Sequence, residues 1–230
     1  MINLGIAFLE AENMPKINKN EVVRYLGYRG INRVDETVEK IIDDCIREMQ
    51  EKVEPKKVYR TFPIEWEEDG GCTFAGIQIK SGNLLKNLKG CSEIVMLAVT
   101  LGSVPDMLVR RAEVRDMMKA YTFQAVGAAL AEAYIDEVND QIKSEAAARG
   151  LFARPRFSPG YGDFPLEVQR DFERILEMSK NIGVTLSDSL LMTPTKSITA
   201  VIGLSDKDAD CTRAGCEECN MKNTCEYSRA

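Results

Sequence analysis

The chain has 230 residues, of which 44% are hydrophobic and 29% charged, a balance typical of one soluble globular domain with a full hydrophobic core. Its formal net charge of −6 argues against a protein that binds nucleic acid, because such a protein needs a basic surface to contact phosphates. The absence of histidine excludes serine–histidine and cysteine–histidine catalysis, and every metal site that needs an imidazole.

The same composition predicts a cytoplasmic protein with no membrane segment. Its apolar runs reach only about ten residues, whereas a membrane-spanning helix needs about 20. The first residues, Met1 to Gly5, lack the basic and apolar regions of a secretory signal. Seven cysteines, an odd number, argue against a secreted disulfide framework and favour a reducing compartment.

Residues 1–55 are expected to form an N-terminal helical segment. Asn18 followed by Glu21 resembles a capping box, which opens a short helix that Gly27 ends. Asp35 is expected to cap a second helix. Its apolar residues recur at the i, i+3, i+4, i+7 spacing of an amphipathic helix until Pro55.

Residues 56–205 are expected to form the folded core, beginning with elements of mixed type. A strand with Pro63 near its end is expected at a sheet edge, because proline cannot donate to a neighbouring strand. A returning strand, a short helix and a buried strand should follow. The four elements are residues 58–64, 73–79, 84–88 and 94–101.

A long helix is predicted over residues 116–147, and between Ala120 and Ile135 it is apolar nearly all round. Glu132 is the only charged residue in that span and shares a face with Tyr121 and Ala125. Because an unpaired buried charge is costly, we expect Glu132 to be paired or functional. The alternative is that Glu132 lies at the edge of the apolar stripe, where it reaches water or pairs with a structural arginine.

The segment from Arg154 to Pro165 contains three prolines and two glycines, which predict a rigid loop rather than a flexible linker. A rigid loop that carries arginines suits the recognition of a carboxylate, although its arginines could simply be solvated. A helix should run from Pro165 to Gly183, followed by β-structure over residues 184–204. The predicted fold class is α+β, with a mostly antiparallel twisted sheet and flanking helices, including one long central helix. No G-x-G-x-x-G follows a strand, so a Rossmann nucleotide site is not supported.

Residues 206–230 form a cysteine-rich tail that we expect to bind metal. It contains four closely spaced cysteines with the pattern C-x4-C-x2-C-x5-C: Cys211, Cys216, Cys219 and Cys225. Four thiolates can hold an iron–sulfur cluster, which we favour, or a structural zinc ion. Disulfides or unliganded thiols remain open. Cys45 and Cys91, by contrast, are expected to be small core residues.

Several segments, in order, resemble the activation domain of vitamin B12-dependent methionine synthase. The stretch from Arg156 to Tyr161, Arg-Phe-Ser-Pro-Gly-Tyr, resembles the family signature R-x-x-P-G-Y. Four further segments resemble family segments, and the likeness runs from about residue 95 to residue 204: residues 99–102, 126–133, 182–189 and 192–199. Residues 25–29 resemble stand-alone members of the family.

The resemblance implies a site for S-adenosylmethionine and docking onto a protein that carries cobalamin. The family supports one-electron reduction of cob(II)alamin, followed by methyl transfer from S-adenosylmethionine. By resemblance, Arg156 would bind the methionyl carboxylate, and Glu132 would attract the ammonium or sulfonium charge. The backbone around Ser158, Pro159, Gly160 and Tyr161 would hold further polar groups of the ligand.

We therefore expect a reactivation subunit for a separate cobalamin-dependent methionine synthase, an accessory component of that methyltransferase that acts in its reactivation. Electrons could come from flavodoxin or ferredoxin, or through the cysteine tail. The alternatives are an activator of another corrinoid methyltransferase, and a metal-stabilised interaction module without ligand chemistry. Three features depart from the family: Gly150 stands where an acidic residue is usual, the family's N-terminal aspartate that contacts the ligand has no counterpart that we can place, and the family segment with paired tyrosines after the last strand is missing.

Overall fold

The structure, a computed structural model, describes residues 14–28 and 34–208 of the chain. These residues fold as an α+β protein in which helices cover both faces of an antiparallel sheet, as the sequence predicts. Within these ranges, no helix has the length and apolar character needed to cross a membrane.

Among the described residues, four strands form the main sheet in the order β1-β5-β9-β6, and every neighbouring pair is antiparallel. Their bounds are β1 (Lys56–Pro63), β5 (Glu93–Thr100), β6 (Phe152–Ala153) and β9 (Ser197–Ser205). The predicted strands over 58–64 and 94–101 are therefore confirmed. The edge position expected from Pro63 is confirmed as well, since β1 lies at one side of the sheet.

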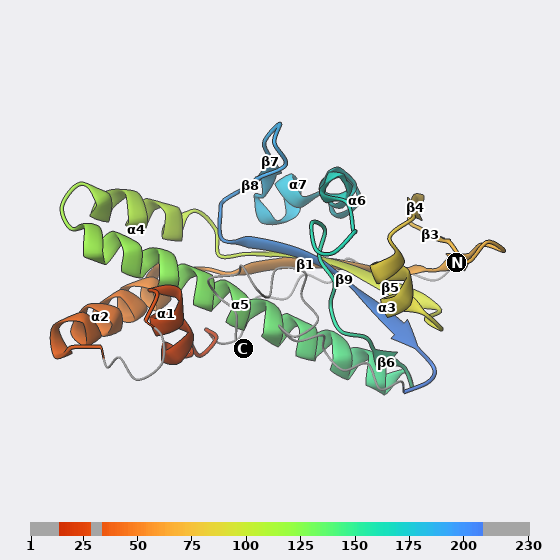
Figure 1. Cartoon of the computed structure of the whole chain (residues 1–230), viewed down its shortest axis with the longest axis horizontal. Coiled ribbons are helices and arrows are strands. Elements are labelled where there is room, and N and C mark those ends of the chain that lie inside the picture. The colour runs from red at the N-terminus through yellow and green to blue at the C-terminus, as the bar shows by residue number, and fades with distance from the viewer. Residues whose placement is uncertain (1–13, 29–33, 209–230) are drawn as a thin grey trace.

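Both faces of the sheet are buried, and each faces a separate hydrophobic cluster. Successive side chains of a strand point to opposite faces. In β5, Val95, Leu97 and Val99 pack into one cluster, and Ile94, Met96 and Ala98 pack into the other. This explains why the sequence of β5 is a continuous apolar run. Figure 1 shows the long helix α5 (Met117–Ala148) on one side of the sheet, and α6 and α7 on the other.

Helices α1 (Lys19–Tyr25), α2 (Glu36–Lys52) and α4 (Val104–Glu113) pack around the first half of α5. The predicted caps are confirmed: the side chain of Asn18 accepts from Asn20 N, and that of Asp35 accepts from Thr37 N and Val38 N. Helix α4 was missed by sequence reasoning. Only one side of this ten-residue helix is buried, and its last turn carries two arginines, so its apolar signal is weak.

The other face of the sheet is covered by α3 (Gly82–Leu88), the 3-10 turn η1 (Leu166–Val168), α6 (Gln169–Leu176) and α7 (Met178–Ile182). The prediction of one helix from Pro165 to Gly183 was wrong. Pro165 precedes the 3-10 turn, and Glu177 then adopts a left-handed conformation, with φ of 47°, which separates α6 from α7.

Two small hairpins complete the described fold. The returning strand predicted over residues 73–79 was wrong, because these residues form two short strands, β3 (Cys72–Phe74) and β4 (Ile77–Ile79), that pair with each other beside β2 (Glu65–Trp66). Ala75 and Gly76 both have positive φ, as a two-residue hairpin turn requires. The β-structure predicted after residue 184 is confirmed as the hairpin of β7 (Thr185–Leu186) and β8 (Met192–Thr193), followed by β9.

The division into residues 1–55, 56–205 and 206–230 stays a prediction. Strand β1 begins at Lys56 and β9 ends at Ser205. Side chains of α1 and α2, such as Val22 and Ile42, belong to the same hydrophobic cluster as those of α5.

Candidate functional site

An ion-pair cluster joins the loop after β6 to the outer face of α5. The guanidinium of Arg156 donates to Glu132 Oε2 at 2.9 Å and to the carboxylate of Asp136. The Arg156 side chain is only 14% exposed, whereas Glu132 and Asp136 are 49% and 53% exposed. The structure therefore brings together the two charged residues that the sequence singled out. Glu132 lies at the edge of the apolar stripe, paired with an arginine.

Asp136 is a member of this cluster that sequence reasoning missed. It lies four residues after Glu132, and residues at that spacing share one face of a helix, so the signal was present. With two carboxylates and one guanidinium, the cluster carries a formal charge of −1. A group of this kind can hold a ligand that combines a carboxylate with positively charged groups.

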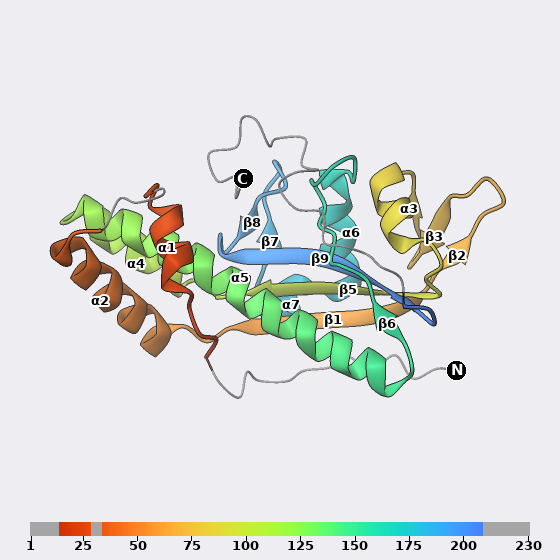
Figure 2. The ribbon, with the colours of Figure 1, turned by 60° about the horizontal axis from the view of Figure 1, so that its bottom comes forward.

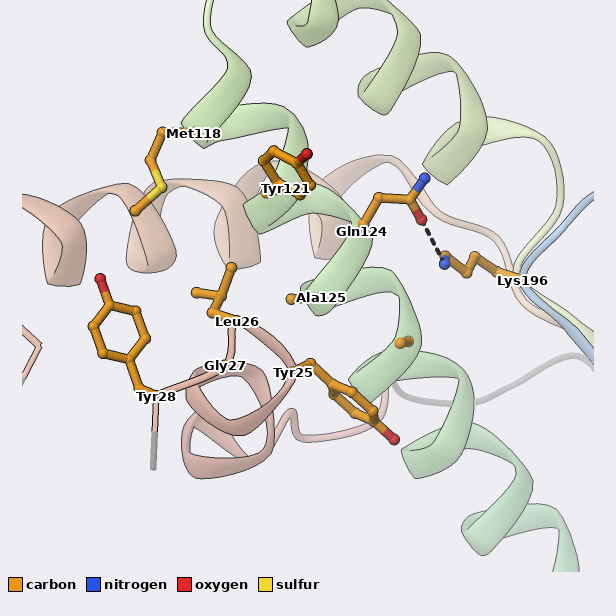
Figure 3. A pocket seen from close by; sticks show the side chains of 10 residues that line it. Tyr25, Leu26, Gly27, Tyr28, Met118, Tyr121, Gln124, Ala125 and Lys196 are labelled. Atoms are coloured by element: carbon orange, nitrogen blue, oxygen red, sulfur yellow. Dashed lines mark hydrogen bonds between the residues drawn. The ribbon is translucent and has the colours of Figure 1, made fainter. Parts of the chain in front are cut away.

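A groove runs along α5 on the N-terminal side of this cluster. It has a volume of about 710 Å³ and is closed on one side by the end of α1 and the residues that follow it (Figure 3). Its lining residues come from three segments of the chain: Tyr25, Leu26, Gly27, Tyr28, Met118, Tyr121, Gln124, Ala125, Ala128 and Lys196. Sequence reasoning did not identify the groove, because these segments meet only through tertiary packing.

Tyr25 connects the groove to the ion-pair cluster. Burial, together with the negative charge of Glu132, raises the pKa of Tyr25. In Figure 3 its hydroxyl group points toward the later turns of α5. On the other side of the groove, Lys196 Nζ donates to Gln124 Oε1 at 2.7 Å. Burial lowers the pKa of Lys196, and its side chain packs closely over Gly127.

The loop from Arg154 to Pro165 is held to neighbouring elements by hydrogen bonds, and Arg156, in its first part, contacts α5. Arg154 is buried and donates to the carbonyl of Lys89 at 3.2 Å, so it serves the core. Phe157 then exchanges backbone hydrogen bonds with Val201 of β9. Further on, the Asp163 carboxylate accepts from Gly82 N at 2.7 Å, which anchors the loop to α3.

In the predicted turn from Ser158 to Tyr161, two backbone N–H groups already form hydrogen bonds within the loop. Gly160 N donates to the carbonyl of Phe164, and Tyr161 N donates to that of Ser158. Pro159 is buried, Gly160 has a φ of 87°, and the side chain of Tyr161 is 70% exposed. The two backbone N–H groups of Gly160 and Tyr161 are thus engaged within the loop, and the exposed phenol of Tyr161 is its most accessible group.

The predicted metal ligands Cys211, Cys216, Cys219 and Cys225 lie outside the described residues. In residues 14–28 and 34–208, no group of three or more cysteine, aspartate or glutamate side chains is arranged to hold a metal ion. Cys45 and Cys91 are buried in the core as predicted, and Cys72 is buried too.

Two of three comparisons relate the chain to known proteins. Residues 85–227, more than half of the chain, match the family described as vitamin B12 dependent methionine synthase, activation domain. Among solved structures, the fold is similar to one titled "Crystal Structure of the MetH Reactivation Domain bound to AdoHcy". The TM-score is 0.66 at 17% sequence identity, and the match covers 94% of this chain and 84% of that one. No curated protein sequence matches.

Proposed function

The chain belongs to the activation-domain family of vitamin B12-dependent methionine synthases, and on that premise we propose that it is an S-adenosylmethionine-binding reactivation subunit. Its client is a separate, cobalamin-carrying methionine synthase, to which it docks as an accessory component. The observation that carries the proposal is the contact of Arg156, from the family's signature loop, with Glu132 and Asp136 on α5.

The charges of this cluster fit the amino-acid end of S-adenosylmethionine. The ligand carries a carboxylate, an ammonium group and a sulfonium group, with a net charge of +1, opposite in sign to the cluster. Arg156 is held by its two partners and is mostly shielded from water, which strengthens a charge-assisted bond to the ligand carboxylate. Glu132 and Asp136, which are half exposed, attract the two cationic groups.

In this proposal the protein binds and orients the ligand, and S-adenosylmethionine supplies the methyl group that the partner's reduced cobalamin accepts. Arg156 and Glu132 fix the methionyl end. The turn from Ser158 to Tyr161, shaped by Pro159 and Gly160, flanks the ligand and offers the hydroxyl groups of Ser158 and Tyr161. The reducing conditions that such chemistry needs are those of the cytoplasm, where we place the protein.

Calorimetric titration of S-adenosylmethionine into the full chain tests the proposal. Arg156→Ala should weaken binding by about 1.5–3 kcal/mol, the usual range for a hydrogen bond to a charged group. Arg149→Ala is a matched control, because Arg149, at the C-terminal end of α5, also joins the helix to another element, pairing with Glu93 of β5 at 2.6 Å, and it lies outside the cluster. Equal affinities of the Arg156→Ala protein and the wild type would refute the assignment of this site.

For the tail, we propose an iron–sulfur cluster held by Cys211, Cys216, Cys219 and Cys225, with zinc as the alternative. The cluster would pass one electron from a flavodoxin or ferredoxin to the partner's cob(II)alamin. The support is the spacing of four cysteines in a segment with few apolar residues, which metal binding would order.

Anaerobic reconstitution with iron and sulfide should give thiolate-to-iron absorption that Cys216→Ser abolishes. Cys72→Ala provides the control, because Cys72 is buried in the core. A wild-type protein that takes up only stoichiometric zinc would rule out the electron relay and leave the S-adenosylmethionine proposal untouched.

A further inference from the structure

The outer edge of β1 is a row of backbone groups that no other strand of the described fold pairs with. We propose that residues 2–8 of the same chain bind this edge as an additional, antiparallel strand. These residues lie outside the described part of the chain, and the edge itself, together with their sequence, carries the inference. It involves neither the ion-pair cluster nor the groove and is independent of the proposed function.

The hydrogen bonds of the sheet fix which groups of β1 face outward. In an antiparallel pair, alternate residues direct both their N–H and C=O groups to the same neighbour. Ile64 N, directly after β1, donates to Ser92 O at 2.9 Å, so the even-numbered residues of β1 face β5. Leu101 N donates to Lys196 O, which agrees, because it directs the odd-numbered residues of β5 to β9 and the even-numbered ones to β1. Three residues of β1 therefore direct their backbone groups away from the sheet: Lys57, Tyr59 and Thr61.

These outward groups are free to pair with a further strand. Among residues 14–28 and 34–208, β5 alone pairs with β1, and no hydrogen bond reaches the outward N–H and C=O groups. Pro63 occupies the next outward position, where its missing N–H costs no bond within the sheet. An open edge of this length is a template for pairing with another chain. A strand bound here satisfies the outward groups and prevents such association.

The described chain begins close to one end of this edge. Gln50 Nε2, in the last turn of α2, donates to Pro15 O at 3.2 Å, and α2 leads directly into β1 (Figure 2). At about 3.3 Å per residue, residues 9–13 can bridge about 16 Å, and residues 2–8 can cover about 23 Å, the length of residues 57–63. A segment that starts beside Lys56 and follows the edge toward Pro63 runs antiparallel to β1, as every neighbouring pair of the described main sheet does.

The sequence of residues 2–8 suits the two faces of β1. Large apolar residues alternate with small or polar ones, which is the period of a strand. The large residues are Ile2, Leu4, Ile6 and Phe8, and between them stand Asn3, Gly5 and Ala7. On one face of β1, the partly buried Phe62 packs into an apolar cluster that includes Met178 of α7. On the other face, Tyr59 donates to Glu145 and accepts from Gln141 of α5. The large residues match the first face, and the small or polar ones match the second.

Hydrogen exchange of the full chain, resolved by residue with NMR, tests the proposal. In the wild type, the outward amides of residues 57, 59 and 61 should be protected, as are the inward amides of Val58 and Arg60 that bond to β5. The double variant Gly5→Pro/Ile6→Pro removes two neighbouring N–H groups, one of which must face β1 in a paired strand. We expect the outward amides to exchange at least tenfold faster in this variant and the inward amides to be unchanged.

Ala11→Pro/Glu12→Pro is the matched control. It places the same two prolines in the same part of the chain, but between the proposed strand and the described residues, where no strand pairing is required. The outward amides should stay protected in this variant. Thermal melting of both double variants verifies folding.

Three results would overturn the inference. Outward amides that exchange freely in the wild type would show that the edge is open. Protection that survives Gly5→Pro/Ile6→Pro would show that something else covers the edge, and a rise of that protection with protein concentration would identify it as a second copy of the chain. Equal loss of protection in both double variants would contradict the assignment to residues 2–8.

Discussion

Tyr59 and Tyr134 are both buried, but the fold satisfies only one of their hydroxyl groups. Tyr59 donates to the carboxylate of Glu145 at 2.9 Å, whereas the hydroxyl of Tyr134 has no hydrogen-bond partner in the part of the chain that the structure describes. Tyr59→Phe should lower the free energy of unfolding by about 1–2 kcal/mol, and Tyr134→Phe should leave it unchanged or raise it by about 1 kcal/mol. Urea unfolding of both variants measures the contrast, and equal losses would contradict it.

The buried thiols of Cys45 and Cys72 predict that the stability of the fold depends on pH. Burial raises the pKa of Cys45 to about 12 and that of Cys72 to about 11. Since an unfolded thiol ionises near pH 8.5, the native protein holds these protons longer. Stability is therefore full below about pH 8.5 and falls as the pH rises toward the native values, by up to about 1.4 kcal/mol per pH unit for each thiol.

Cys45→Ala should show a shallower alkaline loss of stability than the wild type in urea unfolding at pH 8, 9 and 10. Alkylation at pH 8.5, mapped by peptide mass spectrometry, should spare Cys45 and Cys72 in the native protein and modify both in urea. Rapid native labelling of either would show that the thiol is accessible.

At the scale of single residues, the candidate site was partly predictable from the sequence. Helical spacing identified Glu132, and a resemblance identified Arg156, but nothing local pairs residues that lie 24 positions apart. Their contact depends on the path of β6 along β9, which is set by the sheet. Asp136 could have been found from its i+4 position relative to Glu132.

At the scale of elements, one side chain links the signature loop to the helix α3. The Asp163 carboxylate accepts from Gly82 N and Asn83 N, and from the hydroxyl of Ser81. These bonds, the one from Ser81 first, lower the pKa of Asp163. Their contribution is therefore present above the ordinary aspartate pKa of about 3.9 and is lost as the pH falls through the lowered value.

Asp163→Asn should accelerate hydrogen exchange at the amides of Gly82 and Asn83. Asp171→Asn, which alters an exposed pair with Arg174 on α6, is the control and should leave those amides unchanged. As the pH falls from 5 through the lowered pKa of Asp163, the exchange rates of wild type and Asp163→Asn should converge. Unchanged exchange at neutral pH would show that the loop is held on α3 by other contacts.

Elements with strong periodicity were predictable, and those fixed by single turns were not. The helices around residues 36–52 and 117–148 follow from their apolar spacing and their caps. By contrast, the β3–β4 turn depends on Ala75 in a left-handed conformation, which alanine rarely adopts. Glu177, between α6 and α7, also adopts a left-handed conformation. Packing of α6 and α7 against the sheet overrides the preference of glutamate for a right-handed one.

At the scale of the whole molecule, the question is whether the N-terminal helices α1 and α2 fold together with the sheet. They precede residue 85, where the family match begins, yet the structural match covers 94% of the chain. Ile42 of α2 is fully buried in the cluster that contains Leu130 of α5 and Val95 of β5. We infer that α1 and α2 are part of one cooperative unit with the sheet.

Ile42→Ala tests this cooperativity. Removal of this buried side chain should cost about 2–5 kcal/mol, from lost burial and the remaining cavity. Trp66, the single tryptophan, lies on β2 at the opposite end of the molecule from α2 (Figure 2). If the fold is one unit, thermal transitions followed by Trp66 fluorescence and by far-ultraviolet circular dichroism should coincide and shift down together. A Trp66 transition that stays at its wild-type temperature would show that the N-terminal helices unfold separately.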